Sequence, residues 1–372
     1  MTTTHPDVDR AVALIDAGRH EDAAVLLGRR LAESPDDTRA LANLARCHLD
    51  ADRPQEAVEV SAKALEHDPG YVFALLVHAE AVRRAGLGID KALALLHEAV
   101  RLAPDYWYGY AKLAQLTGRR ALLRYAQESG KQDLTGEDMA HVFPEAAALA
   151  EEAIRLGPDE VYAYEVAREI ANFSGATEDV DRFDRAILRL DPTHEEALAN
   201  QTRRAANGPE VTAAKASTLY ADALAAAPDS SAMRGGLDHA TYRLLRGTRW
   251  LAVLCVVLGG GMINLFPTGE GPTLPVPLGE RLWFLVVMGA IWALGAWRSY
   301  RRLRTGVQLN VRSLIRRELW ARIVLAQTAC TMLCALLIAQ VPWTDRTVPQ
   351  ILFWTGLVVP WLTISSDRDK IQ

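Results

Sequence analysis

Prolines recur at nearly constant spacing through the first 230 residues, and this regularity constrains the fold more than any other feature. The intervals between successive members are 34, 35, 54, 34 and 36 residues, for Pro35, Pro69, Pro104, Pro158, Pro192 and Pro228. Proline lacks a backbone N–H and disfavours helical geometry in the residue before it, so each one is suited to end a helix. A period of this length predicts a repeated pair of short helices.

Alanines stand at fixed distances before these prolines. Ala23, Ala57 and Ala92 each lie 12 residues before a proline, while Ala64 and Ala99 lie five before. Two antiparallel helices that pack closely leave no room for a large side chain where they cross, so a small residue recurs there. The segment is therefore predicted to be a row of closely packed helical hairpins.

A helix-turn-helix period of 34 residues with small residues at fixed places and a terminal proline resembles the tetratricopeptide repeat (TPR) family. The resemblance covers about residues 9–230 as six repeats. It is clearest in repeats two, three and five, which carry Leu44, Ala57, Ala64 and Pro69; Ala79, Ala92, Ala99 and Pro104; and Tyr164, Ala167, Gly175 and Pro192. Repeat one departs with Arg30 at the Ala64 position, and repeat five has Val180 at the Ala57 position. The resemblance implies an all-α solenoid, a right-handed superhelix of hairpins that stack to bury their apolar faces.

The concave surface of such a stack implies binding of a protein or peptide. In the family the first helix of each repeat lines this groove, which gives six candidate binding residues: Arg46, Glu80, Arg83, Tyr108, Lys112 and Glu165. For each, the alternative is an ordinary solvated helix face, and for Tyr108 it is packing between repeats within the aromatic cluster 106–110. The Lys/Asn clamp with which some family members hold C-terminal carboxylates is absent from the matching positions, so that ligand is not carried over.

The 54-residue interval holds an insertion at about residues 115–143. Compact repeat arrays usually allow only short connections. The insertion is therefore interpreted either as a functional element or as a lengthened helix pair.

Charge and composition change after about residue 235. Residues 240–372 hold 15 of the 41 Lys+Arg and 6 of the 46 Asp+Glu, a balance of +9, so the first 239 residues hold 26 and 40, a balance of −14. Four apolar runs occupy the basic tail, at about 250–266, 282–297, 320–341 and 351–364. A membrane-spanning helix needs about 20 residues, with about 17 as the lower edge. The sequence predicts a repeat domain over 1–235 and a transmembrane helix bundle over 236–372.

Two alternatives stay open for this tail. The runs could be buried helices of a second globular domain, although they carry almost no charge and lack the polar stripe that such helices show to water. The fourth run is short and contains Pro360, so it could dip into the bilayer instead of crossing it.

Tryptophans and arginines at the ends of the runs support the membrane interpretation. Tryptophan rings favour the headgroup level, and six are predicted interface anchors: Trp250, Trp283, Trp297, Trp320, Trp343 and Trp361. Arginines crowd the segment between the second and third runs, which the positive-inside rule puts in the cytoplasm. With four spans both termini share that side, in agreement with a polar N-terminus that lacks a secretory signal. Arg322 lies close enough to the cytoplasmic end to reach the headgroups.

No pattern in the sequence predicts catalysis. The four cysteines lack metal-ligand or redox spacing, and no nucleophile or phosphate-loop motif is present. We expect neither an enzyme nor a cofactor or metal site. The acidic first part disfavours nucleic acid as a partner, because phosphate binding needs a clustered basic surface.

The leading functional hypothesis is a multi-pass scaffold at the inner membrane that presents a cytoplasmic TPR groove to a protein or peptide. Arg outnumbers Lys by 35 to 6, a bias typical of GC-rich bacterial genomes. In an alternative, the helix bundle is the working part of a transport, secretion or enzyme complex that the repeats regulate. Gly289 and Ala293 are spaced for close helix packing in membranes, which allows a homo-oligomer.

Overall fold

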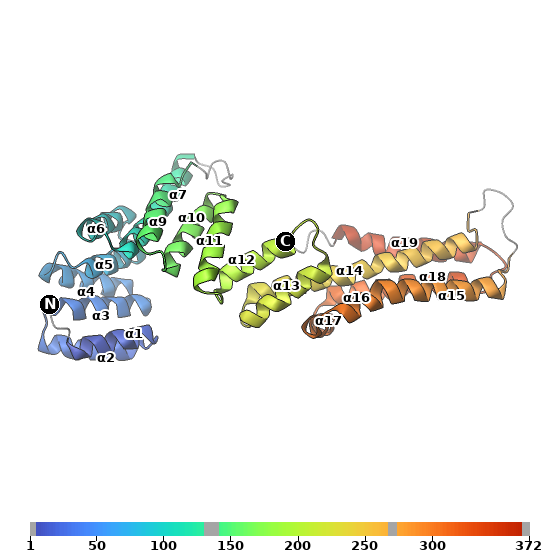
Figure 1. Cartoon of the computed structure of the whole chain (residues 1–372), viewed down its shortest axis with the longest axis horizontal. Helices are drawn as coiled ribbons and strands as arrows, with labels where there is room; N and C mark the ends of the chain where they lie inside the picture. Colours follow the sequence, from blue (N-terminus) through green and yellow to red (C-terminus); the bar gives the residue numbers. More distant parts are fainter. Residues whose placement is uncertain (1–4, 130–140, 267–273, 367–372) are drawn as a thin grey trace. The chain divides into compact units, whose positions relative to one another are not determined.

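The computed structural model describes residues 5–129, 141–266 and 274–366, and all regular elements within these ranges are helices (Figure 1). Packing divides the chain into two compact units, unit 1 over residues 1–192 and unit 2 over residues 193–372. The predicted all-helical fold is confirmed.

The described part of unit 1 consists of five antiparallel helix pairs in chain order, and each pair packs against the next. Its helices are α1 (Pro6–Asp16), α2 (His20–Glu33), α3 (Thr38–Asp50), α4 (Pro54–His67), α5 (Val72–Arg84), α6 (Ile89–Leu102), α7 (Trp107–Ser129), α9 (Pro144–Leu156), α10 (Val161–Phe173) and α11 (Thr177–Leu190). They coincide with predicted repeats one to five. Within the array, each helix packs on the one that follows it in the chain, so the second helix of a repeat contacts the first helix of the next.

The small residues predicted at the helix crossings are buried. Ala23, Ala57, Ala64 and Ala92 have no exposed surface, and Ala99 is 1% exposed. Short side chains at these places let the two helix backbones approach, which is what closes each hairpin.

The turns inside the hairpins share one backbone conformation. Gly18, Asp52, Gly86 and Gly175 follow the first helix of repeats one, two, three and five, with φ of 76°, 56°, 71° and 73°. Positive φ suits glycine because it has no Cβ, and aspartate is among the residues that tolerate it. The repeated turn is therefore set by local backbone chemistry.

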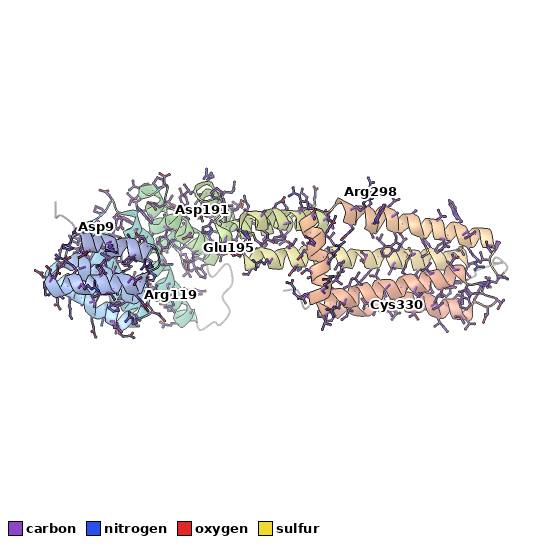
Figure 2. All side chains as sticks on the ribbon, turned by 90° about the horizontal axis from the view of Figure 1, so that it is seen from below. Asp9, Arg119, Asp191, Glu195, Arg298 and Cys330 are labelled. Carbon is purple, nitrogen blue, oxygen red and sulfur yellow. The ribbon has the colours of Figure 1, made fainter. Side chains whose placement is uncertain are left out.

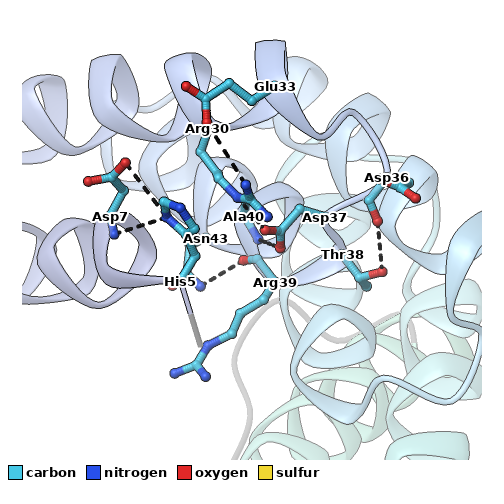
Figure 3. Close-up of polar contacts among 10 residues, drawn as sticks. All are labelled: His5, Asp7, Arg30, Glu33, Asp36, Asp37, Thr38, Arg39, Ala40 and Asn43. Carbon is cyan, nitrogen blue, oxygen red and sulfur yellow. Dashed lines mark hydrogen bonds and ion pairs between the residues drawn. The ribbon is translucent and has the colours of Figure 1, made fainter. Parts of the chain in front are cut away.

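Arg30, the departure from the pattern in repeat one, has an acidic partner that compensates for its charge. Its Nε donates to Asp37 Oδ2 at 2.8 Å, and the other oxygen of Asp37 accepts from the Ala40 N–H at 3.0 Å at the start of α3 (Figure 3). Burial would raise the pKa of Asp37, but these hydrogen bonds and the Arg30 charge lower it below its usual range. Arg30 thus braces the N-cap of the next repeat.

The insertion in repeat four lengthens the first helix of its pair. α7 has 23 residues, whereas α3, α5 and α10 each have 13. The remainder of the predicted insertion includes residues 130–140, which lie outside the described residues. The extra turns of α7 add a wall to the surface formed by the first helices.

Unit 2 begins with one more helix pair and continues into long apolar helices. Its elements are α12 (Glu195–Ala206), α13 (Ala213–Ala226), α14 (Ser231–Met262), α15 (Leu278–Trp292), the π-helical turn η1 (Ala293–Trp297), α16 (Arg298–Arg302), α17 (Thr305–Arg317), α18 (Leu319–Gln340) and α19 (Thr347–Ser366). The pair α12–α13 corresponds to predicted repeat six. The composition boundary predicted near residue 235 falls inside α14, a single helix that joins this pair to the first apolar run.

The arginine-rich segment packs against the α12–α13 end of unit 2. Arg304 pairs with Asp222 of α13, and Arg317 pairs with Asp238 of α14. Asn310 Nδ2 donates to Asp238 Oδ1 at 3.0 Å, and Val307 is fully buried among α13 and α14 residues. The basic segment, which includes α17, therefore contacts both α13 and the first part of α14. These contacts hold the three together at one end of the bundle.

Arg322 is held by protein backbone. Its Nε donates to the Ile315 carbonyl at 2.9 Å, and its Nη2 donates to the Arg316 carbonyl. Carbonyls at a helix C-terminus lack partners within their own helix, and a basic side chain suits them. Arg322 thus caps α17, a role different from the headgroup contact expected of it.

Three helices within the described residues are long and apolar enough to cross a membrane: Ser231–Met262, Leu278–Trp297 and Leu319–Gln340. They overlap the first three predicted runs, although the first run was predicted to extend to 266 and its helix ends at Met262. The fourth run corresponds to α19, which remains helical through Pro360. Large apolar side chains are exposed along the bundle, among them Val286 and Leu294 on the α15–η1 segment. Exposed apolar surface of this extent is typical of contact with lipid or another protein.

The six predicted anchor tryptophans differ in exposure. Trp250, Trp283, Trp297 and Trp361 are each more than half exposed. Trp320 and Trp343 are half-buried, and Trp343 donates through Nε1 to the Leu337 carbonyl at 3.0 Å. The first four are the side chains with the surface available for headgroup contact, and their assignment as anchors stays a prediction.

Gly157 gives a test of the close packing in repeat four. A Cβ at this buried position would lie 2.7 Å from Cγ of Trp107, near the stem of a large side chain that cannot easily move. We expect Gly157→Ala to lower the free energy of unfolding by about 1–3 kcal/mol because Trp107 must shift. Urea unfolding of the fragment 1–192, followed by circular dichroism, measures this.

Gly28→Ala is the matched control, because Gly28 lies inside α2 with open space around the added Cβ. It should raise stability by about 0.5–1 kcal/mol through helix propensity. Equal effects of the two substitutions would contradict the packing role of Gly157.

Candidate functional site

A groove runs across the first helices of repeats three, four and five in unit 1. It encloses about 380 Å³ and lies between α5, α7 and α10, with Leu96 of α6 and Phe143 completing it. Its lining comprises Leu76, Ala79, Glu80, Arg83, Leu96, Lys112, Gln115, Leu116, Gly118, Arg119, Leu122, Leu123, Phe143, Glu169, Ile170 and Phe173. We call it the α5–α7–α10 groove.

One part of this groove is apolar and open. Phe143 and Phe173 stack with ring centroids 6.2 Å apart, and Phe143 is buried while Phe173 is 43% exposed. Leu123, on the extension of α7, is 48% exposed. Exposed leucine and phenylalanine over a buried apolar base form a surface that gains free energy when an apolar side chain covers it.

Glu80 and two arginines occupy the α5 side. Arg83 binds both carboxylate oxygens of Glu80, with Nη2–Oε1 at 2.6 Å and Nε–Oε2 at 2.9 Å, while Arg84 Nε donates to Oε1 at 2.7 Å. Burial alone would raise the pKa of Glu80, but the hydrogen bonds from Arg83 and Arg84 outweigh it and hold the pKa at about 2. Glu80 is therefore an anion at neutral pH and fixes Arg83 in the groove wall.

Lys112 lies over two aromatic rings at the centre. Its Nζ is 5.3 Å from the centroid of the Tyr108 ring and 5.1 Å from that of Tyr162. Burial opposes the charged form of Lys112, yet the Tyr108 and Tyr162 hydroxyls and the Glu80 carboxylate raise its pKa. The ammonium group is thus charged and held by cation–π contact.

Gln115 joins α7 to α10 through polar contacts. Its Nε2 donates to Glu169 Oε2 at 3.2 Å, and its Oε1 accepts from the Tyr162 hydroxyl at 3.4 Å. These contacts fix the orientation of the polar side chains that lie between α7 and α10.

Arg119 is the exposed cation of the groove. It lies one helical turn from Gln115 on α7, where Figure 2 labels it. Within the described ranges no carboxylate lies within ion-pair distance of its guanidinium. Arg119 is therefore available to an anionic group of a ligand.

The groove brings together some of the six predicted binding residues. Glu80, Arg83 and Lys112 line it, and Tyr108 stands beneath Lys112. Arg46 lies elsewhere on the array, where its Nη2 pairs with Asp16 Oδ1 at 3.2 Å. Glu165 is half-buried on α10 and does not line the groove. Partner binding by all six stays a prediction.

Sequence reasoning missed the apolar part of the groove and Arg119. The available signal was periodicity, because Lys112, Gln115, Arg119 and Leu123 recur at three- and four-residue steps and so share one helix face.

Paired antiparallel helices stacked in chain order define a helical-repeat domain. Residues 14–79 match the family model described as tetratricopeptide repeat. That match runs from α1 into α5. Comparison with curated proteins gives no match.

Several solved structures match this chain at low identity. TTC0263 of Thermus thermophilus is 22% identical, with 54% of this chain and 96% of that one covered and a TM-score of 0.42. Pseudomonas aeruginosa pilF is 16% identical, with 61% and 93% covered and a TM-score of 0.44. YrrB, described as a TPR protein with an unusual peptide-binding site, is 16% identical, with 56% and 95% covered and a TM-score of 0.36.

The Glu80 cluster predicts a pH-dependent stability. A carboxyl whose pKa falls from 4.5 to about 2 on folding contributes stability above pH 4.5 and loses it as the pH falls through about 2. We expect Glu80→Gln to lower the free energy of unfolding at pH 7 by roughly 1–2 kcal/mol, reduced for solvent screening. The deficit relative to wild type should shrink below pH 4.5. Urea unfolding of fragment 1–192 across pH measures it.

Glu98→Gln is the matched control. Glu98 binds Arg101 through both oxygens at 2.6 and 2.8 Å, also with three-residue spacing, but on the exposed face of α6. Exposed pairs of this kind contribute little. If Glu98→Gln cost as much as Glu80→Gln, the groove cluster would have no special role in stability.

Proposed function

We propose that the protein is a membrane-anchored scaffold whose α5–α7–α10 groove binds a segment of a partner protein. The observation that carries the proposal is the combination of an open apolar surface at Leu123 and Phe173 with the exposed cation Arg119. TPR domains mediate protein–protein interaction, and residues 14–79 match that family. The groove thus supplies a surface on which such a segment could lie.

The lining indicates the chemistry of the segment. An aliphatic or aromatic side chain would cover Leu123 and Phe173, where exposed apolar surface is removed from water. A carboxylate one or two residues away would reach Arg119 in a charge-assisted hydrogen bond. Arg83 is already held by both carboxylate oxygens of Glu80, so it serves as a wall of fixed geometry.

Membrane anchoring is the second part of the proposal. Three helices have the length and apolarity to span a bilayer, and their outward surfaces carry large apolar side chains. The arginine-rich α17 packs at the same end of unit 2 as α13. The positive-inside rule then assigns α12–α13 and the basic segment to the cytoplasmic side.

Photo-cross-linking from the groove tests partner binding. With a photoreactive phenylalanine analogue at Leu123 or Phe173 of the full chain in cells, we expect one shared cross-linked partner. The same analogue at Val25, 58% exposed on α2, should not capture it. Arg119→Glu should weaken capture through charge repulsion, while Arg101→Glu on the exposed α6 face should not. Equal capture from Val25 would argue against the groove.

Cysteine labelling tests the topology. In a chain whose four native cysteines are replaced by alanine, Thr344→Cys lies between α18 and α19, and Thr305→Cys lies at the start of α17. With intact cells and a membrane-impermeant maleimide, we expect labelling at position 344 and protection at position 305. Both sites labelled or both protected would contradict the proposed arrangement.

A further inference from the structure

A second groove, in unit 2, lies between α14 and α19 where α14 enters its apolar run. It encloses about 330 Å³, and its lining combines two arginines, three tryptophans and aliphatic side chains. We call it the α14–α19 groove. None of the residues that line it belongs to the α5–α7–α10 groove of unit 1.

The arginines form one end of this groove. Arg246 and Arg249 stand three residues apart on α14 and so share a face. Arg249 is only 2% exposed, and Arg246 is half-buried. Among the described residues that line the groove, none is acidic. A guanidinium presents its N–H donors in a planar fork that matches phosphate, so this end suits a phosphate group.

Aliphatic side chains form the other end. Val253 lies one turn beyond Arg249 on α14, and Leu357 and Val358 face it from α19. These side chains offer no hydrogen bonds, so an inorganic phosphate gains nothing from them. A hydrocarbon chain that continues from the phosphate would bury apolar surface there.

Tryptophans flank the boundary between the two ends. Trp250 of α14 and Trp361 of α19 are 64% and 70% exposed, and both belong to the lining. Indole rings favour the level of lipid headgroups, because they pair an apolar body with one N–H donor. The order arginine, tryptophan, aliphatic along α14 therefore follows the order phosphate, glycerol, acyl chain in a phospholipid.

We propose that the α14–α19 groove binds one anionic phospholipid, with its phosphate on Arg246 and Arg249 and one acyl chain along Val253 and Val358. The inference rests on the proposed membrane insertion of unit 2. The groove holds the headgroup and the first part of the chains, and the rest of the lipid extends into the bilayer. Such a lipid ties the middle of α14 to the second half of α19.

Native mass spectrometry of the full chain in detergent tests the site, with phosphatidylglycerol and phosphatidylcholine as probes. We expect wild type to retain one phosphatidylglycerol roughly tenfold more tightly than phosphatidylcholine, since two basic groups face the headgroup. Arg246→Gln should remove most of this preference. Arg243→Gln, one turn earlier on exposed α14 surface, should leave it unchanged.

Val358→Trp separates a lipid from a soluble phosphate ligand, because it fills the aliphatic end and leaves both arginines in place. We expect it to abolish lipid retention, and we expect excess glycerol phosphate not to compete in wild type. Competition by glycerol phosphate together with retention in Val358→Trp would overturn the lipid assignment in favour of a soluble anion. Equal losses in Arg243→Gln and Arg246→Gln would overturn it in favour of diffuse surface charge.

Cell fractionation distinguishes failure of this site from failure of the proposed function. A chain that leaves the membrane fraction without detergent would refute both membrane insertion and the lipid site. A chain that needs detergent but retains both lipids equally would refute the lipid site alone.

Discussion

Close contact between antiparallel helices is the interaction on which unit 1 depends. It requires a small residue at each crossing, and the buried alanines of α2, α4 and α6 satisfy this requirement at a constant distance from the terminal proline. No single hairpin can bury its apolar face, so each must stack on the next. Once stacked, the first helices necessarily share one surface, and the groove between α5, α7 and α10 follows from that geometry.

The length of α7 turns this shared surface into a defined groove. A first helix of ordinary length would end near Arg119, whereas α7 continues for about three further turns and carries Leu122 and Leu123 past the neighbouring helices. Phe143 and Phe173 complete the apolar part from the other side. The lengthened-helix interpretation of the insertion therefore holds for α7, and a functional role of the insertion stays part of the proposal.

Polar contacts organise unit 2 at the end where its apolar helices begin. Arg304 and Arg317 of the basic segment meet Asp222 and Asp238, and Arg322 caps the helix that carries that segment. Exposed ion pairs contribute little individually. Here they accompany the burial of Val307, which supplies the apolar component of the same contact. The basic segment from which a topology was predicted thus also links helices of unit 2 to one another.

The sequence by itself determined the helical hairpins, their period and the apolar runs. These depend on local rules, since proline ends a helix, alanine permits a close crossing and a run of apolar residues excludes water. Only the tertiary structure decided which charged side chains are paired within the protein and which remain available to a ligand. Arg83 and Arg46 have similar sequence settings, yet one is fixed by Glu80 in the groove wall and the other pairs with Asp16 outside it. Arg322 likewise turned from the headgroup position expected of it to the carbonyls of α17. A long side chain pairs with whichever group the packing of helices brings within reach, and such groups need not lie on the same helix. Periodicity could therefore place each arginine on a helix face, but it could not predict the partner that the arginine would contact there.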